Sequence, residues 1–178
     1  MNKNMQYYRN ILEKLKIDFD ALDMATILSE PSEDIPTYIL NVLHTELSFE
    51  EEEVMGEYYF LPLKDENPRY HVFTSMLTLS EQMPEVKYED LGRAANLLNF
   101  YLPTGAFVFS KPEGIIAYKH SSLIPMGYDQ QEALKLIDGH IAMSLNIVHQ
   151  YMDIFMKLMK GKMSLNDFLN TLPNAFWM

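Results

Sequence analysis

The chain has 178 residues, 48% of them hydrophobic and 22% charged, which is enough apolar material for the core of one folded domain and argues against a disordered chain. Its formal net charge of -11 argues against binding to nucleic acid or to an anionic membrane surface, because both carry negative charge. The chain has no cysteine, which excludes disulfides, thiolate zinc sites and thiol nucleophiles.

The N-terminal residues contain no apolar core of a signal peptide, and no apolar run reaches the length of a membrane span. We therefore expect a soluble, cytoplasmic protein. The first expected element is an amphipathic helix over about residues 4–16. Residues 18–30 leave two alternatives open, a short second helix or a loop with an extended piece.

Three stretches rich in strand formers follow, at about residues 37–47, 56–63 and 70–79. The third alternates, with Phe73 and Leu77 on one face and Thr74 on the other. Since the stretches are consecutive and separated by turn residues, they predict an antiparallel three-strand meander over about residues 37–79.

A second helix is expected over about residues 84–102, between two prolines. After it, residues 105–120 predict a β-hairpin, with Pro112 and Gly114 in the turn. If a bulge follows the turn, Phe109 lies opposite Ala117 and Val108 lies opposite Tyr118. Both faces of the hairpin are then apolar, and both need to be covered.

The C-terminal part predicts a long helix over residues 129–160. Asp129 is a favourable N-cap, and Glu132 three residues later completes a capping box. A short last helix over about residues 164–172 is capped by Ser164 and ends at Pro173. The sequence therefore predicts a single α+β domain over residues 1–178, with an antiparallel sheet of about five strands in the order α-βββ-α-ββ-α.

The apolar arc of the long helix is unusually broad, at roughly 220° around the helix axis, whereas packing on one sheet needs an arc of about 100° or somewhat more. This helix is therefore expected to contact two neighbours. One is the sheet, and the other is the first helix, the last helix or a second subunit. The apolar residues that lie beside its main stripe are Met143, Ile147, Tyr151, Ile154 and Leu158.

The predicted order of elements is that of the type III secretion chaperone-like fold. Three segments resemble the corresponding part of YbjN-type domains: Leu-Leu-Asn at 97–99, Gly-Ala-Phe-Val-Phe at 105–109 and Ile-Ile-Ala-Tyr-Lys at 115–119. In those domains a helix ending in Leu-Asn runs into a two-strand hairpin, and a long helix follows. The resemblance implies an α+β fold, frequent homodimers, and protein-binding or chaperone-like roles instead of catalysis.

The sequence contains no glycine-rich phosphate loop and no calcium-loop spacing in the acidic run at 50–53. Ser121 and Ser122 lack a nearby histidine-and-acid pattern. A site built from His44, His71 and His120 is a minority interpretation, since structural histidines are far commoner than three-histidine metal sites. His140 and His149 are nine residues apart and lie on opposite sides of the helix, so they cannot share a metal.

We therefore predict no catalytic, metal or cofactor site. The favoured hypothesis is a non-enzymatic protein-binding or chaperone-like module that acts as a homodimer and binds neither nucleic acid nor membrane. The alternatives are a small-molecule-binding or enzymatic domain with a cleft between sheet and helix, and a structural partner of one obligate protein. The candidate partner or dimer contacts are Val108, Ile116, Tyr118, Met143, Ile147, Tyr151, Ile154 and Leu158.

Overall fold

A computed structural model describes residues 3–48, 53–63 and 69–175. Its elements follow the chain in this order: α1 (Lys3–Asp20), β1 (Thr26–Ser29), β2 (Ile39–His44), β3 (Val54–Phe60), β4 (Tyr70–Ser80), the 3-10 helix η1 (Glu85–Lys87), α2 (Tyr88–Asn99), β5 (Ala106–Ser110), β6 (Ile115–Pro125), α3 (Gln130–Met159) and α4 (Leu165–Ala175). The strands form one antiparallel sheet in the order β1-β2-β3-β4-β6-β5. The predicted α+β class, with helices packed on an antiparallel sheet, is confirmed.

The sheet has six strands where about five were expected, and the additional strand is β1. The sequence left residues 18–30 open between a helix and a loop with an extended piece. In the structure α1 continues to Asp20, the chain turns at Asp23 with a positive φ of 60°, and β1 then pairs with β2. The second alternative was therefore the closer one, and its extended piece forms the edge of the sheet.

The long helix α3 begins and ends within one residue of the predicted bounds. The backbone N–H of Glu132 donates to the Asp129 carboxylate at 2.9 Å, and the N–H of Asp129 donates to the Glu132 carboxylate at 3.0 Å. This reciprocal pair is the predicted capping box.

The same motif at Ser164 and Asp167 begins α4, which continues two residues past Pro173. Proline removes one helical hydrogen bond but keeps a helical φ, so the predicted end at Pro173 was wrong.

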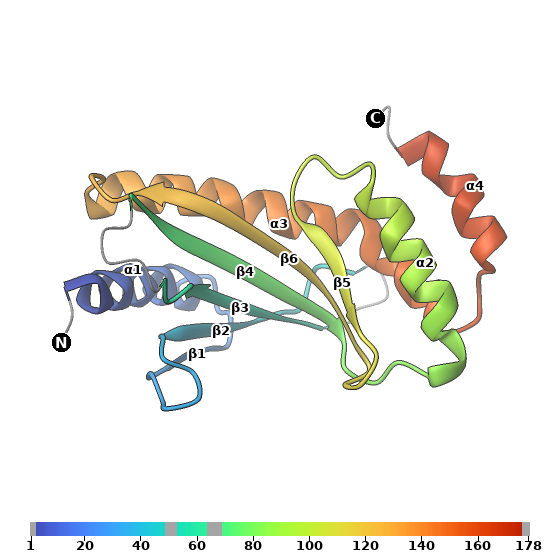
Figure 1. Ribbon diagram of the computed structural model, residues 1–178, viewed down its shortest axis with the longest axis horizontal. Coiled ribbons are helices and arrows are strands. Elements are labelled where there is room, and N and C mark those ends of the chain that lie inside the picture. The colour runs from blue at the N-terminus through green and yellow to red at the C-terminus, as the bar shows by residue number, and fades with distance from the viewer. Residues whose placement is uncertain (1–2, 49–52, 64–68, 176–178) are drawn as a thin grey trace.

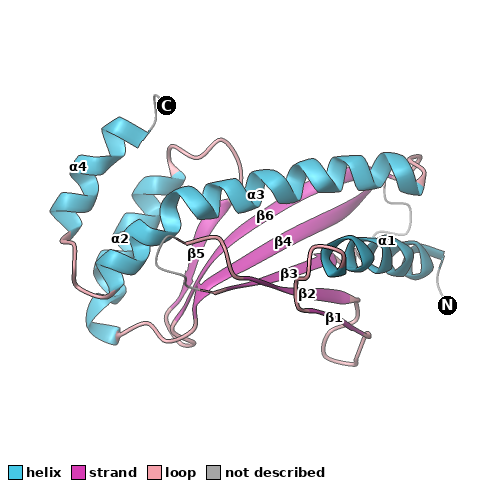
Figure 2. Ribbon diagram, turned by 180° about the vertical axis from the view of Figure 1, so that it is seen from behind, coloured by secondary structure: helices cyan, strands magenta, loops and turns pink. Residues whose placement is uncertain are grey.

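The second neighbour of α3 lies within the chain. Besides β4 and β6, α3 contacts α1 along its first half and α2 and α4 along its last half (Figures 1 and 2). The ring of Phe155 lies 4.7 Å from that of Phe107 in the sheet and 6.0 Å from that of Phe168 in α4, measured between centroids. The broad apolar arc is therefore occupied by the sheet and by the chain's own helices.

The β5–β6 hairpin forms where predicted, but its register differs by one residue. Phe109 pairs with Ile116 and Val108 pairs with Ala117, because residues 111–114 close directly on the pair Ser110 and Ile115 without the assumed bulge. A one-residue shift exchanges the two faces of a strand. The aromatic side chains Phe107, Phe109 and Tyr118 therefore point to one face of the sheet. The prediction that both faces of the hairpin need to be covered was wrong, since Val108 on the other face is exposed.

Helices lie on one face of the sheet only. Figure 2 shows α1 and α3 in front of the strands, and Figure 1, from the opposite side, shows the strands with no helix in front of them. We call the first the covered face and the second the helix-free face. Strand β4 illustrates the difference, since Phe73 and Leu77 on the covered face are fully buried. On the helix-free face, Met76 is only partly buried.

Candidate interaction surface

The helix-free face consists of alternate residues from all six strands, and its rows follow from the strand register. The middle row runs directly across the sheet through Ile27, Asn41, Glu57, Met76, Lys119 and Ala106. The row on one side runs through Leu43, Met55, Thr78, Ala117 and Val108. The row on the other side runs through Ser29, Ile39, Tyr59, Thr74 and Ser121.

Short side chains lie beside the central row of this face, and apolar side chains are exposed towards its rim. Thr74, Thr78 and Ala117 have less than a tenth of their surface exposed although no helix covers them, because neighbouring strands pack around these short side chains. Towards the rim, Ile27 is 67% exposed and Leu123 is 59% exposed. Clusters of exposed apolar residues on a soluble domain commonly mark a surface that binds a partner.

Two opposite charges lie at the centre of the helix-free face. Glu57 and Lys119 are each directly opposite Met76, one on β3 and the other on β6, so about 10 Å of sheet separates their Cα atoms. Within the described part of the chain, neither side chain forms an ion pair or hydrogen bond. Burial, with a smaller contribution from Glu81, raises the pKa of Glu57. The carboxylate would therefore be stabilised by a cation brought to this face.

The structure places the eight candidate contact residues in different environments. Five of them are buried in the core and are unavailable to a partner in this structure: Ile116, Tyr118, Ile147, Tyr151 and Leu158. Ile154 is partly buried against the same core. Only Val108, on the helix-free face, and Met143, on α3, are substantially exposed, at 38% and 48%. The buried five were selected because they widen the apolar arc of α3 or because of the assumed hairpin register.

The histidines do not form a common metal site. His44 lies 2.8 Å from the Tyr58 hydroxyl, and His71 lies 3.0 Å from the Tyr8 hydroxyl. His120 instead stacks on His140, with ring centroids 3.9 Å apart. Among the described residues no three histidines or carboxylates are grouped as metal ligands. The acidic run at 50–53 lies outside these residues, apart from Glu53.

The pairing of His120 with His140 was not foreseen from the sequence. The two residues come from β6 and α3, and only the placement of the helix over the strand brings them together. A signal was nevertheless present, because His140 and Ser144 are four residues apart and fall within the apolar stripe of α3. Polar residues in such a stripe are buried with each other or with partners from the facing strand.

Comparison with known proteins gives no match, either to a protein-family model or to a curated protein sequence. The resemblance to YbjN-type domains therefore stays a prediction. Among the described residues, no helix is both long enough and apolar enough to cross a membrane.

Proposed function

We propose that this chain is a non-enzymatic protein-interaction module that self-associates through the helix-free face of its sheet. The observation that carries the proposal is the self-complementary arrangement of this face around β4. The resemblance of the hairpin region to YbjN-type domains, which often form homodimers, supports the same class of function.

The complementarity follows from the order of the strands. If a two-fold axis runs along β4, strand β3 of one copy faces β6 of the other, and β2 faces β5. Glu57 of each copy then lies opposite Lys119 of the other, and two such pairs flank the Met76–Met76 contact at the centre. In the next row, Leu43 meets Val108. This single operation therefore matches the two charges and this apolar pair, while Asn41 lies opposite Ala106 and β1 lies outside the overlap.

The size of the face indicates weak association. Only β2, β3, β4, β6 and β5 overlap between the two copies, because no strand lies beyond β5 to face β1. Their four spacings of about 4.8 Å, over about 20 Å of strand length, give roughly 400 Å² per copy and about 800 Å² in total. Stable interfaces bury about 1,200–2,000 Å² in total, so the dimer is expected to dissociate on dilution. The net charge of -11 on each copy adds repulsion, which salt at about 0.15 M screens.

The test is a charge exchange followed by sedimentation equilibrium over a wide range of concentrations. Lys119→Glu and Glu57→Lys each place like charges opposite each other twice in the dimer, so each variant is expected to dissociate at higher concentrations than the wild type. The double variant restores opposite charges and should recover dimerisation. Lys111→Glu, in the hairpin turn, changes the net charge as Lys119→Glu does and should leave dimerisation much less affected.

Three results would contradict the proposal. The first is a wild-type protein that stays monomeric at all concentrations. The second is a double variant that associates no better than the single variants. The third is a Lys111→Glu variant as impaired as Lys119→Glu, since this would indicate a response to net charge alone. Circular dichroism of each variant establishes that the fold is intact.

A further inference from the structure

A second group of polar side chains lies away from the helix-free face, between β6 and the middle of α3. It borders a cavity of about 420 Å³, whose wall includes His120, Ser122, Gly139 and His140. Strand β5 pairs with β6 only as far as Lys119, so the edge of β6 is free of β5 beside this cavity. The rest of the wall is mainly apolar, from Leu136 and Met143 on α3 and from neighbouring residues.

The hydrogen bonds of His120 are complete and define its tautomer. The Ser144 hydroxyl donates to the His140 backbone carbonyl at 2.8 Å, so its oxygen is left to accept from Nδ1–H of His120 at 3.0 Å. Nε2 of His120 then carries no proton and accepts from the Thr104 hydroxyl at 2.6 Å. His120 is therefore a fixed, fully bonded wall of the cavity.

His140 and Ser122, in contrast, each keep a buried polar atom without a partner. Nε2 of His140 lies 2.8 Å from the Ser75 hydroxyl, but Nδ1 of His140 has no hydrogen-bond partner, and neither has the Ser122 hydroxyl. His140 is 6% exposed. Both residues line the cavity, but the two unpaired atoms are themselves buried beneath its surface, so a bound polar group reaches them only when their side chains rotate towards it.

Gly139 keeps this part of the cavity open. It lies in the interior of α3, where glycine is less favourable than alanine. An added Cβ at this position would meet no atom within 4 Å, so packing within the chain does not require glycine here. A methyl group at Gly139 would instead enter the space that this residue borders.

The surroundings select an uncharged ligand. No lysine, arginine, aspartate or glutamate is among the residues that line the cavity, so the charge of a bound ion would not be balanced. Burial, together with the neighbouring His120, lowers the pKa of His140 to about 3, and burial also lowers the pKa of His120. Both imidazoles are therefore neutral near pH 7, and offer hydrogen bonds without charge.

We infer that the cavity between β6 and α3 binds a small, uncharged molecule with an apolar body and one hydroxyl or amide group. That polar group bonds to Nδ1 of His140 and to the Ser122 hydroxyl after these side chains rotate towards it, while the body lies against Leu136 and Met143. The site shares Leu123 with the rim of the helix-free face, but none of the residues that pair in the proposed dimer line it.

Three matched probes test the chemistry of this ligand: benzyl alcohol, toluene and benzoate. Each is titrated at pH 7.5 into ¹⁵N-labelled protein while amide and imidazole ¹H–¹⁵N spectra are recorded. Benzyl alcohol is expected to cause saturable shifts at Gly139 and at the His140 imidazole. Toluene lacks the polar group and should bind at least about fivefold more weakly, which corresponds to about 1 kcal/mol for one hydrogen bond. Benzoate carries a charge and should cause no saturable shift.

Two variants locate the site. Gly139→Ala adds a methyl group to the cavity wall and should weaken benzyl alcohol binding at least about tenfold, although it improves the helix propensity of α3. Gly127→Ala is the matched control, because an added Cβ there also meets no atom within 4 Å and Gly127 does not line the cavity. This control should bind as the wild type does. Ser122→Ala should reduce the preference for benzyl alcohol over toluene, because only His140 then remains to bond the hydroxyl.

The inference is overturned if benzyl alcohol gives no saturable shift, which would mean that ordered water alone satisfies His140 and Ser122. Equal binding of benzyl alcohol and toluene would also overturn it, because the polar groups would then have no role. So would unchanged binding in Gly139→Ala, since the probe would be bound elsewhere.

Discussion

The covered and helix-free faces are built from alternate residues of the same six strands, yet they place side-chain volume and polarity differently. On β4, the covered face carries Phe73 and Leu77, and the helix-free face carries Thr74 and Thr78. Apart from Ser122 and one nitrogen of His140, the polar residues of the covered face are histidines and hydroxyls bonded to each other, whereas Glu57 and Lys119 on the helix-free face have no such partner within the described chain. The comparison teaches that the covered face is complete within the monomer except at the cavity beside His140, while the centre of the helix-free face can still gain interactions.

The largest expected effect is the difference in unfolding free energy lost when a side chain is truncated on one face of β4 or on the other. Phe73→Ala removes a fully buried ring that packs against Phe60 and His140, and should lower the free energy of unfolding by about 3–5 kcal/mol. Met76→Ala, three residues along β4 on the helix-free face, should cost about 1 kcal/mol or less. Urea denaturation at a concentration where the protein is monomeric measures both. Similar losses in the two variants would show that the faces do not differ as described.

The second effect is a loss of stability in acid that arises from the covered face. Burial lowers the pKa of His44 to about 4 from an unfolded value of 6.5. The unfolded chain therefore binds more protons between these values, and stability falls as the pH is lowered from about 6.5 to 4. One such group contributes up to about 3 kcal/mol over this window. His140, whose pKa is lowered to about 3, acts in the same direction.

Glu57, on the helix-free face, makes the stability depend on pH in the opposite direction. Its folded pKa is raised, so the folded state binds the proton more readily than the unfolded state, and stability rises as the pH falls through that pKa. Urea denaturation between pH 7.5 and 4.5 should show a net fall, which is shallower in His44→Asn and steeper in Glu57→Gln. An unchanged slope in His44→Asn would contradict the assignment of this acid sensitivity to the covered face.

The same contrast explains what could be predicted from the sequence. Alternation on β4 and the caps of α3 are local signals, so the class of fold and the bounds of the long helix followed from them. The hairpin register depended on whether a bulge follows Gly114, and one residue of error moved Tyr118 to the wrong face. The stacking of His120 on His140 requires the packing of α3 over β6, which no spacing within the sequence encodes. The helix-free face could be recognised only once the hairpin register and the placement of α3 over β6 were known.

A third effect, of intermediate size, lies where the chain enters the hairpin. Gly105 has a φ of +61°, and a Cβ added to it would collide with the ring and hydroxyl of Tyr118, which donates to the Thr104 carbonyl at 2.9 Å. Gly105→Ala should therefore cost about 2 kcal/mol or more from backbone strain and overlap on the covered face. In the background of Tyr118→Phe the added cost should be smaller, because the hydroxyl is absent. A double-mutant cycle measured by urea denaturation compares the two, and strictly additive losses would exclude a contribution of the hydroxyl to the overlap.

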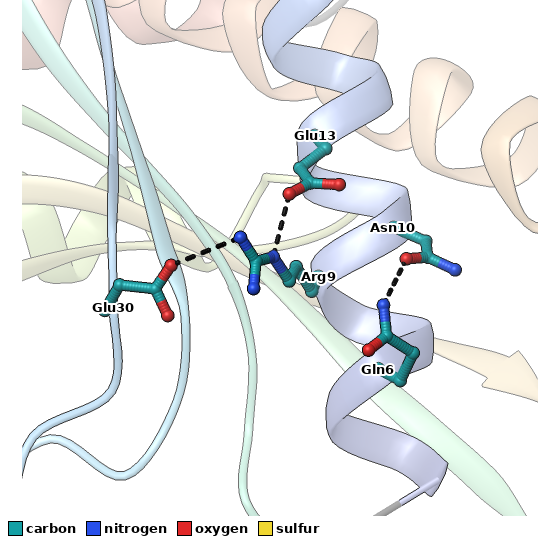
Figure 3. A network of polar contacts seen from close by, with 5 residues as sticks. All are labelled: Gln6, Arg9, Asn10, Glu13 and Glu30. Carbon is teal, nitrogen blue, oxygen red and sulfur yellow. Dashed lines mark hydrogen bonds and ion pairs between the residues drawn. The ribbon is translucent and has the colours of Figure 1, made fainter. Parts of the chain in front are cut away.

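The smallest expected effect is a local loss of stability at the edge of the sheet, where side chains of α1 contact the residues that follow β1. Arg9 on α1 contacts Glu13 at 2.8 Å and Glu30 at 3.6 Å, as Figure 3 shows, and its guanidinium lies over the ring of Tyr38. Because these ion pairs are substantially exposed, their contribution to global stability is small and salt-dependent. Their effect should appear locally, since β1 pairs only with β2 and can open without global unfolding.

Hydrogen exchange of the β1 amides therefore measures this link more sensitively than denaturation. Arg9→Gln should accelerate exchange in β1 at low salt and leave exchange in β4 unchanged. Lys14→Gln is the matched control, because Lys14 also pairs with an acid one turn away, Asp18, but that pair lies within α1. Faster exchange in β1 for both variants would assign the effect to helix stability instead. Faster exchange for Arg9→Gln alone would establish that the covered face is held by side-chain contacts at its edge as well as by its core.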